Sequence, residues 1–316
     1  MIAIGVDIGG TSIKGASINS KGEILDRFSL KVNKSDSAEV TVGNLCNIIN
    51  DFKKEHVYEE DIAGIGIGVP GIADFDSGLL ISSPNLPTWN GFNLKTFIKA
   101  KTGLEVYLNN DANVAALGEA VFGSAKKYND VIMLTLGTGV GGGIIINKHI
   151  YDGHMHQGAE LGHMVIRMGG RLCGCGRKGC LEAYASATGL ITDTKIAMEK
   201  DPDSKLHEVA KELGGVDARV AFEAMRRDDK SAKRVVRNYV KYLSEGIINY
   251  CNIFRPEVVV LSGGVANEGE YLFKMIRRYL KKHTYGMKGS PKVDIKMASL
   301  GYDSGKIGAA CLVLNK

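Results

Sequence analysis

The chain contains 316 residues, of which 44% are hydrophobic and 24% are charged, and its formal net charge at pH 7 is +5. Because acidic and basic residues are interspersed, this charge does not imply a nucleic-acid-binding surface. The first apolar segment is interrupted by Asp7 and has no basic leader, and the longest uncharged run is rich in glycine. We therefore expect no signal peptide and no membrane span, and a cytoplasmic protein long enough for two domains.

The first third of the chain predicts a β-rich unit closed by a helix. Apolar residues alternate between turns that contain glycine, which favours short strands, and a later segment has apolar residues at helical spacing. The predicted strands are Ile2–Val6, Ser12–Ile18, Glu23–Leu30 and Ile62–Val69, and the predicted helix is Ala38–Glu55.

The remaining two thirds repeat this order, with a long insertion. A strand at Val131–Leu136 pairs with Gly142–Asn147, and after the insertion come a helix at 231–254, a strand at Val258–Leu261, a helix to about Lys282, a strand at Lys292–Met297 and a helix from Ser304. This order predicts a duplicated α/β unit with a site in the cleft between the copies. We expect a smaller domain of residues 1–112 and 301–316 and a larger domain of residues 113–300.

Three glycine-rich turns are candidates for binding phosphate. Backbone N–H groups in such turns can approach an anion closely, and the hydroxyl of Thr11 adds a donor. Asp7 lies at the end of the first strand, where it could hold Mg²⁺ through water. The alternative is that these residues form an ordinary hairpin turn that binds no phosphate. The turns are Gly9-Gly10-Thr11, Gly137-Thr138-Gly139-Val140-Gly141-Gly142-Gly143 and Gly263-Gly264.

Two segments, beginning at Gly66 and Gly137, match the GxGxxG pattern of dinucleotide-binding proteins. Neither opens a helix, because the first runs into Pro70 and the second turns into another strand. A Rossmann site needs a strand, a glycine turn and then a helix, so we exclude it. The chain also lacks the GxxxxGK[ST] pattern of a P-loop.

Three of the six cysteines are close together in the sequence, which indicates a metal site rather than a disulfide framework. His163, Cys173, Cys175 and Cys180 form a Cys₃His set that suits tetrahedral zinc and leaves no open position for a catalytic water. We therefore predict a structural zinc site within a loop of about residues 154–184. The alternative is a group of unconnected thiols near an unrelated histidine. The other cysteines, which are Cys46, Cys251 and Cys311, have apolar neighbours and are expected to be unreactive core thiols.

Three carboxylates are candidates for chemistry. Asp111 follows a strand at Val106–Leu108 and precedes a predicted helix, so it is either a helix cap or a general base for a substrate hydroxyl. Glu160 and Glu182 flank the metal segment, and they are either acceptors for sugar hydroxyls or solvated loop charges. The residues alone leave these alternatives open.

Together the motifs resemble the glucokinases of the ROK family (repressors, open reading frames and kinases), which have the actin-like, hexokinase-type ATPase fold. The matching segments span nearly the whole chain. The most specific are Glu160–His163 (ELGH) and Cys173–Glu182 (CGCGRKGCLE), and the others are Asp7–Lys14 (DIGGTSIK), Gly68–Gly71 (GVPG), Ser83–Leu86 (SPNL), Asn110–Glu119 (NDANVAALGE) and Leu136–Gly143 (LGTGVGGG). The resemblance implies two duplicated α/β domains of this ribonuclease H-like type.

The resemblance also implies a homodimer that uses ATP and Mg²⁺ to phosphorylate a hexose, with glucose 6-phosphate as the product. It implies that Asp111 is the base acting on the sugar 6-hydroxyl and that His163 binds both zinc and sugar, since ligation would fix its ring. The other implied sugar contacts are Gly71, Asn85, Asn110, Glu160 and Glu182. The implied ATP contacts are Asp7, Gly9, Gly10, Thr11, Lys14, Gly137, Thr138, Gly139, Gly141, Gly142, Gly143, Gly263 and Gly264, although Lys14 can also point away from the nucleotide.

Related proteins offer three other interpretations. Sugar-responsive repressors carry a DNA-binding helix-turn-helix before the phosphate strand, and that strand begins here at Ile2, so we do not expect one. An ATPase that activates enzymes through an iron–sulfur cluster would need iron on the cysteines, whereas His163 as fourth ligand favours zinc. Kinases for N-acetylmannosamine, N-acetylglucosamine, fructose or allose share the motifs, and only the segment Ser83–Leu94 favours glucose.

Overall fold

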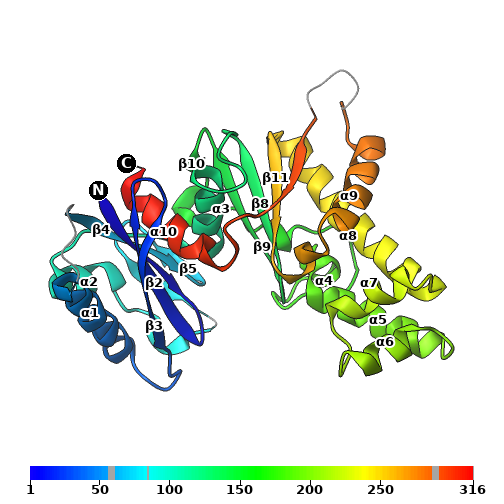
Figure 1. The fold of residues 1–316 in the computed structure, drawn as a ribbon, viewed down its shortest axis with the longest axis horizontal. Helices are drawn as coiled ribbons and strands as arrows, with labels where there is room; N and C mark the ends of the chain where they lie inside the picture. Colours follow the sequence, from blue (N-terminus) through cyan, green and yellow to red (C-terminus); the bar gives the residue numbers. More distant parts are fainter. Residues whose placement is uncertain (56–60, 84, 287–291, 316) are drawn as a thin grey trace. The chain divides into compact units, whose positions relative to one another are not determined.

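The computed structural model describes residues 1–55, 61–83, 85–286 and 292–315 (Figure 1). Pro84 of the SPNL motif lies outside the described residues. Contacts divide the chain into a first unit of residues 1–130, 143–159 and 299–316 and a second unit of residues 131–142 and 160–298. The domain limits expected from the sequence differ from these units, because they assign residues 113–130 and 143–159 to the larger domain. The expected limits stay a prediction.

A five-stranded sheet in the order β3-β2-β1-β4-β7 forms the centre of the first unit. β1, β2 and β3 pair antiparallel through short turns, whereas β1 pairs parallel with β4 and β4 with β7. The strands are β1 (Ile2–Ile8), β2 (Ser12–Asn19), β3 (Ile24–Lys31), β4 (Ile62–Val69) and β7 (Val106–Asn110). Because β1, β4 and β7 are parallel, their carboxyl ends share one edge of the sheet, which therefore carries Asp7 and Asn110.

Helices and a small hairpin surround this sheet. The helices are α1 (Ala38–Glu55), α2 (Leu94–Thr102), α3 (Asp111–Val121) and α10 (Ser304–Leu314), and the hairpin consists of β5 (Ile72–Asp74) and β6 (Leu79–Ser82). α1 buries the apolar side chains of Val42, Leu45 and Ile49 in a core that also contains Ile4 and Ile65. This burial follows from their spacing on one helical face.

The C-terminal helix α10 is almost entirely buried, and it packs on β1, β4 and α3. Glycines permit this close approach. A Cβ atom on Gly308 would collide with the carbonyl oxygen of Val114 in α3, and one on Gly66 in β4 would collide with the carbonyl oxygen of Ala309. Because both obstacles are backbone atoms, neither position can accept a side chain without moving the helix.

The second unit is built on the strands β8 (Val131–Leu136), β11 (Val258–Ser262) and β12 (Asp294–Met297), which pair in parallel. The full sheet has the order β10-β9-β8-β11-β12 and includes β9 (Val140–Ile146) and β10 (His149–Ile150). The boundary between the two units falls within β9, since residues up to Gly142 belong to the second unit and Gly143 begins a segment of the first.

Helices fill most of the rest of the second unit. They are α4 (Glu182–Ala185), α5 (Ala187–Lys200), α6 (Leu206–Glu212), α7 (Ala218–Arg226), α8 (Lys230–Phe254) and α9 (Glu270–His283). Two buried tyrosines of α8 hold the segments on either side of the cysteines, because Tyr250 donates a hydrogen bond to the carbonyl of Leu161 (2.6 Å) and Tyr239 donates one to that of Ala185 (2.8 Å).

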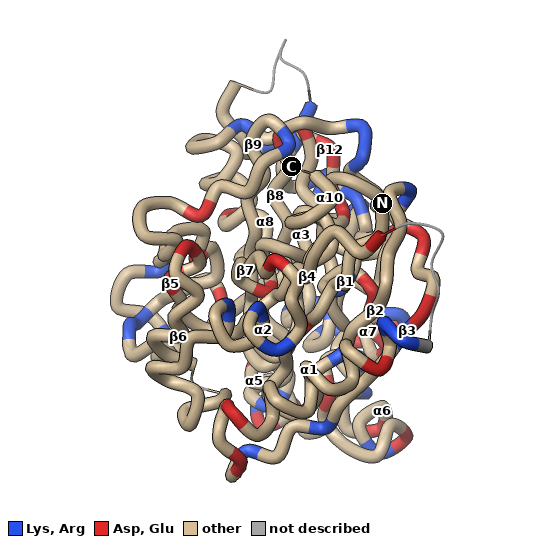
Figure 2. The backbone as a smooth tube through the Cα atoms, turned by 90° about the vertical axis from the view of Figure 1, so that its left-hand side faces the viewer, with Lys and Arg blue, Asp and Glu red and all other residues tan. Residues whose placement is uncertain are grey.

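Charged residues of both signs alternate along the described part of the chain (Figure 2). Several form surface ion pairs between neighbouring elements. Arg227, which follows α7, pairs with Glu208 (3.0 Å) and Glu212 (2.5 Å) of α6. Exposed pairs of this kind contribute about 0–1 kcal/mol each, so they fix local geometry more than overall stability. No helix among the described residues is both long and apolar enough to cross a membrane.

The predicted strands and long helices are present at nearly the predicted positions. The sequence analysis did not predict α2, the hairpin β5–β6, or the helices α4, α5, α6 and α7 within the insertion. Cys46, Cys251 and Cys311 are buried, as expected for core thiols. Burial raises the pKa of Cys46 and of Cys251 to about 11 and that of Cys311 to about 12.

Candidate functional site

Asn110 and Asp111 lie where β7 ends and α3 begins. The side chain of Asn110 caps α3, accepting from the backbone N–H of Ala112 (2.9 Å) and of Asn113 (3.4 Å). Oδ1 of Asp111 also accepts from the N–H of Ala112 (2.8 Å). Because Asn110 takes the capping position, the cap alone does not explain the choice of aspartate at position 111.

The turn between β1 and β2 brings together several residues predicted to contact ATP. The N–H of Gly9 donates to the carbonyl of Ser12 (2.9 Å), which closes the turn before Thr11. A Cβ atom on Gly10 would lie 3.1 Å from Cβ of Asn85, so this turn packs against a residue implied in sugar binding. Gly71 has a φ of +89°, which favours glycine.

Asp7 lies beside this turn, opposite Lys14 in the β1–β2 register. Burial raises the pKa of its carboxyl group, against the opposing charges of Lys14 and Lys306. Lys14 is exposed, whereas Lys306 is buried and paired with Asp303 (2.6 Å). A Cβ atom on Gly305 would lie 2.8 Å from Oδ2 of Asp7, so the start of α10 backs the carboxylate. As register partners on neighbouring strands, Lys14 and Asp7 lie on the same face of the sheet, and the direction of the Lys14 side chain toward or away from a nucleotide stays a prediction.

In the second unit, the glycine turn after β8 is tied to Glu182. Oε2 of Glu182 accepts from the N–H of Val140 (3.0 Å), and a Cβ atom on Gly139 would collide with that same oxygen. The carbonyls of Gly137 and Thr138 accept from the N–H of Ala187 (2.8 Å) and from the hydroxyl of Thr188 (2.7 Å) at the start of α5. Glu182 is therefore not simply a solvated loop charge, because its carboxylate accepts a hydrogen bond that orders this turn.

The third glycine turn lies beside the end of β8. Gly263 has a φ of +89°, and a Cβ atom there would lie 2.5 Å from the carbonyl oxygen of Leu136. The backbone of Gly263 thus packs against Leu136, the residue just before the 137–143 turn. Of the remaining predicted residues, Gly142 packs on Leu161 and belongs to the second unit, whereas Gly143 packs on Ala112 and Ala116 in the first. Gly141 is exposed, and Gly264 has no heavy atom within 4 Å of an added Cβ.

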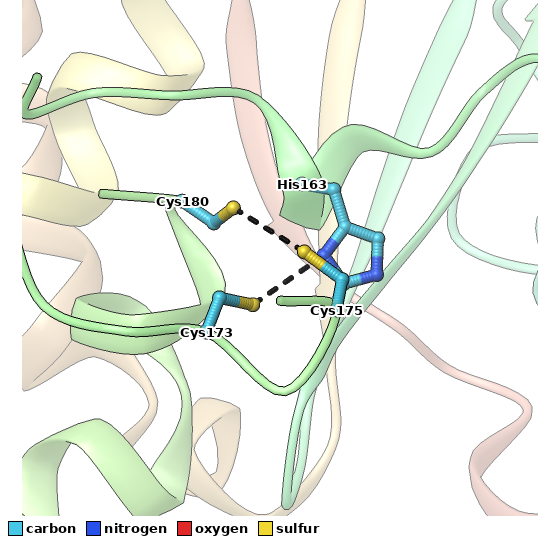
Figure 3. A group of neighbouring side chains, drawn as sticks. All are labelled: His163, Cys173, Cys175 and Cys180. Atoms are coloured by element: carbon cyan, nitrogen blue, oxygen red, sulfur yellow. Dashed lines mark hydrogen bonds between the residues drawn. The ribbon is translucent and has the colours of Figure 1, made fainter. Parts of the chain in front are cut away.

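The four predicted metal ligands converge in the second unit (Figure 3). Their ligand atoms all lie within 4.8 Å of one another, with Nδ1 of His163 3.6 Å from Sγ of Cys173 and Sγ of Cys175 3.7 Å from Sγ of Cys180. Tetrahedral zinc, with bonds of about 2.3 Å to sulfur and 2.0 Å to nitrogen, separates two sulfurs by about 3.8 Å and a sulfur from a nitrogen by about 3.5 Å. The donor set and its spacing therefore fit zinc.

Backbone bonds shape the loop that carries these ligands. The N–H of Cys173 donates to the carbonyl of Arg177 (2.8 Å), and that of Gly176 donates to the carbonyl of Cys173 (3.0 Å). Burial raises the pKa of the Cys173 thiol to about 12, whereas the N–H of Arg177 lowers the pKa of Cys175. Thiol ligands bind metal as thiolates, so metal binding would release protons here.

Glu182 and Glu160 lie on either side of this cluster. Oε1 of Glu182 accepts from Sγ of Cys173 (3.4 Å), so this side chain bridges the metal loop and the 139–140 turn. Glu160 is exposed and precedes the single helical turn Leu161–His163, with its carbonyl accepting from the N–H of His163 (3.1 Å). Since Nδ1 of His163 faces the thiols, Nε2 is the ring nitrogen left for another ligand.

The sequence pattern of the ROK family matches residues 3–316. The chain belongs to the ROK family. It is 36% identical to the glucokinase of Halalkalibacterium halodurans, in a match that covers 98% of this chain and 94% of that protein. It also resembles the crystal structure of a ROK family glucokinase from Streptomyces griseus in complex with glucose and AMPPNP, with a TM-score of 0.79, 33% identity and full coverage of both chains.

Regulators are also among the relatives, since the xylose repressor of Bacillus subtilis is 30% identical over 99% of this chain and 77% of its own length. The mixed α/β architecture, with a sheet and helices in each unit, confirms the predicted hexokinase-type, actin-like fold of ROK proteins.

Sequence reasoning missed two buried polar groups in this ROK chain. Glu119 of α3 is fully buried, and its Oε1 accepts from the N–H groups of Ser299 (2.8 Å) and Leu300 (2.7 Å) just before α10. Asn109 is nearly buried and bonds to Asp152 (3.0 Å). Glu119 ends the NDANVAALGE motif and Asn109 directly precedes it, so proximity to the motif could have marked both residues. Their hydrogen-bond partners could not be predicted, because they are distant in the sequence.

Proposed function

We propose that this protein is an ATP-dependent sugar kinase that phosphorylates a hexose, with D-glucose as its substrate and glucose 6-phosphate as the product. The observation that carries the proposal is the position of Asp111, a carboxylate that directly follows the carboxyl end of the parallel strand β7. Asn110 takes the capping position of the helix that Asp111 begins. Full-length similarity to glucokinases supports the reaction and the substrate.

In the proposed mechanism, Asp111 accepts the proton of the sugar 6-hydroxyl as that oxygen attacks the γ-phosphorus of ATP. A positioned base contributes about 10²–10⁴-fold to such a rate, and phosphoryl transfer otherwise depends on positioning and charge neutralisation. The residues proposed to bind the other sugar hydroxyls are Gly71, Asn85, Asn110, Glu160, His163 and Glu182.

Backbone N–H groups of the glycine turns are proposed to bind the phosphates of ATP, with the hydroxyl of Thr11 as a further donor. Asp7 would hold Mg²⁺ through water, and Mg²⁺ neutralises charge on the phosphates. The buried setting of Asp7 supports this role, because a carboxylate kept in a poorly solvated place gains most from a cation.

His163, Cys173, Cys175 and Cys180 are proposed to hold a structural zinc ion. A filled Cys₃His shell supplies folding energy rather than catalysis. Zinc on Nδ1 of His163 would fix the ring and leave Nε2 for a sugar hydroxyl. Glu182 lies beside Cys173 and accepts from the N–H of Val140, which supports a loop whose metal site and glycine turn are adjacent. The family resemblance also supports a cytoplasmic homodimer.

A coupled assay of ADP release over a panel of hexoses and N-acetylhexosamines tests the reaction and the substrate. We expect the highest kcat/KM with glucose, and a higher value with N-acetylmannosamine, N-acetylglucosamine, fructose or allose would replace glucose in the proposal. Asp111→Asn should lower kcat by about 10²–10⁴-fold while zinc content and the melting temperature stay unchanged. Asp26→Asn, at a half-buried site of β3 outside the proposed site, is the control, and near-normal turnover of Asp111→Asn would exclude Asp111 as the base.

A further inference from the structure

Asn109, the residue before the proposed sugar-binding Asn110, uses both ends of its side-chain amide. Its Oδ1 accepts from the N–H of Asn110 (2.8 Å) and from Nδ2 of Asn113 (3.0 Å). Its Nδ2 donates to Oδ2 of Asp152 (3.0 Å). Only 8% of Asn109 is exposed, so water cannot readily replace these partners. The amide therefore has one orientation that satisfies all three bonds.

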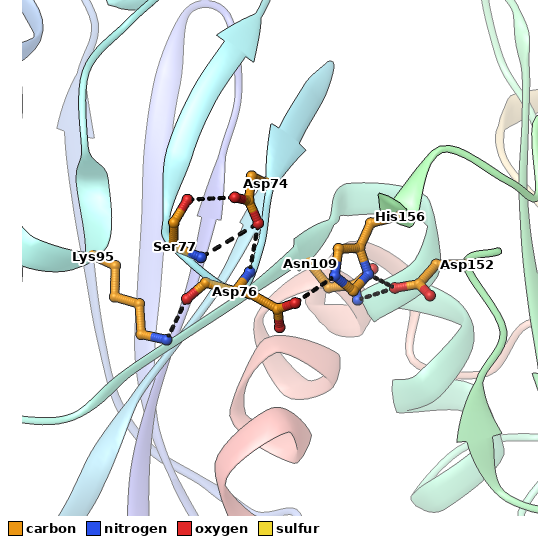
Figure 4. A network of polar contacts seen from close by, with 7 residues as sticks. All are labelled: Asp74, Asp76, Ser77, Lys95, Asn109, Asp152 and His156. Atoms are coloured by element: carbon orange, nitrogen blue, oxygen red, sulfur yellow. Dashed lines mark hydrogen bonds and ion pairs between the residues drawn. The ribbon is translucent and has the colours of Figure 1, made fainter. Parts of the chain in front are cut away.

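Asp152 is the acceptor that sets this orientation (Figure 4). The same Oδ2 that receives Nδ2 of Asn109 lies 2.8 Å from Nδ1 of His156, and the Asp152 side chain is 17% exposed. If this carboxylate were absent, Nδ2 of Asn109 would lose its acceptor and the amide could rotate. Rotation would remove Oδ1 from Asn113, whose own buried Oδ1 has no hydrogen-bond partner among the described residues.

His156 is the second hydrogen-bond partner of the Asp152 carboxylate. Its ring packs against Phe75 of the β5–β6 hairpin, with 5.2 Å between ring centres, and its Nε2 lies 3.5 Å from Oδ2 of Asp76. Both Met155 and His156 have a positive φ (54° and 59°), which is unfavourable for a residue other than glycine. The turn is therefore held by its contacts, and the bond between His156 and Asp152 is one of them.

The charged groups around His156 favour its protonated form. Asp152 comes from the same loop, Asp74 and Asp76 come from the hairpin, and Lys95 of α2 contacts only the backbone carbonyl of Asp76 (2.9 Å). Burial lowers the pKa of His156, but the hydrogen bonds and charges of Asp152 and Asp76 outweigh it, so the pKa is raised overall.

We propose that Asp152 and His156 are positioning residues that lock the Asn109 amide and so fix the backbone of Asn110 and Asp111. This role rests on the proposed function of Asp111 as the base. Neither side chain needs to touch substrate, because both act through Asn109. A small displacement of a reacting group can cost about 10²-fold in rate, so loss of the lock should affect kcat.

Kinetics of four variants test the proposal. Asp152→Ala and His156→Ala should each lower kcat for the hexose about 10-fold or more and leave the KM for ATP within about twofold. His156→Asn should restore most of the kcat, because an Asn amide nitrogen can take the place of Nδ1 and Asn tolerates a positive φ. His154→Ala, an exposed neighbour in the same turn, is the control and should match the wild type.

Amide hydrogen exchange measured over residues 108–114 gives a second readout that does not need activity. Exchange should be faster in Asp152→Ala and unchanged in His154→Ala. Wild-type kcat and wild-type exchange in Asp152→Ala would overturn the proposal, as would equal losses in His156→Asn and His156→Ala. If the wild-type protein phosphorylates no hexose, the proposed function fails, and the exchange rates still decide whether Asp152 fixes this segment. If Asp152→Ala does not fold, exchange in His156→Ala provides the comparison, because that variant removes the side chain that holds Asp152.

The raised pKa of His156 adds a pH signature. A folded state that binds the proton more tightly than the unfolded chain gains stability that is complete below the ordinary pKa of about 6.5 and is lost as pH rises through the folded pKa. The urea midpoints of wild type and His156→Asn should therefore differ more at pH 6 than at pH 9. A difference that does not change with pH would show that the charged ring is not part of the lock.

Discussion

Asp7 and Asp303 are carboxylates of the first unit whose pKa values move in opposite directions. Burial raises the pKa of Asp7 despite Lys14 and Lys306. Asp303 also loses hydration, but its bonds to Lys306 (2.6 Å) and Arg27 (2.8 Å) outweigh that loss and lower its pKa. At neutral pH, ionised Asp7 therefore destabilises the folded state, whereas ionised Asp303 stabilises it.

Replacing each of these residues by asparagine should separate function from stability. At pH 7, Asp7→Asn should raise the urea midpoint, because the neutral amide avoids the cost of a buried charge, while kcat falls about 10²-fold or more through loss of the proposed Mg²⁺ contact. Asp303→Asn should lower the midpoint. For Asp7, the difference from wild type should shrink as pH falls through the raised pKa of the wild-type carboxyl group, because that group then becomes neutral. A lower midpoint for Asp7→Asn at pH 7 would contradict this account.

Among single residues, local sequence patterns predict groups whose members lie close together in the chain. His163, Cys173, Cys175 and Cys180 were predicted as a metal set because their types and spacing suffice, and the structure brings them together. The lock on Asn109 was not predicted, because Asp152 and His156 lie more than forty positions along the chain. A lone Asp and a lone His in a loop carry no pattern, and only the tertiary fold makes them partners.

At the scale of elements, the loop from His163 to Glu182 carries both the predicted zinc ligands and predicted sugar contacts. A change that disrupts the loop should therefore impair zinc binding and sugar binding together. Cys175→Ser, or removal of zinc by a chelator, should lower the melting temperature and raise the KM for the hexose, because the ligand set then leaves His163 and Glu182 unfixed.

Measured zinc content and hexose KM distinguish this effect from general destabilisation. Cys46→Ser makes the same chemical change in the core of the first unit, so it should lower stability while zinc content and KM remain those of the wild type. An unchanged melting temperature and KM in Cys175→Ser would exclude a structural role for the metal.

The elements themselves were predicted unevenly. Long helices such as α1 and α8 and the buried strands of both sheets have strong periodicity, so they were found to within a few residues. The hairpin β5–β6 was missed because its strands are short and expose the apolar residues Ile72, Leu79 and Ile81, which removes the usual alternation of apolar and polar residues. The short helices α4 and α6 depend on packing against neighbouring helices, which no local pattern records. By contrast, α7 has an amphipathic pattern in its own sequence, and it was overlooked.

At the scale of the whole molecule, α10 connects the two ends of the chain, since it packs on β1 and β4. Gly308→Ala adds one methyl group against the carbonyl of Val114 and should lower the free energy of unfolding by about 1–3 kcal/mol. Gly43→Ala is the matched control, because no heavy atom lies within 4 Å of an added Cβ in α1, and it should raise stability by up to about 1 kcal/mol. Urea unfolding measures both, and equal stability of the two variants would contradict close packing of α10.

The position of α10 also bears on how the chain folds during synthesis. The first unit begins with β1, but it lacks its central helix until residues 304–314 have emerged from the ribosome. Nearly all of the second unit, residues 160–298, is translated before that helix. The surface of β1 and β4 that α10 covers must therefore remain exposed until then, and the segment translated first is expected to complete its native packing last.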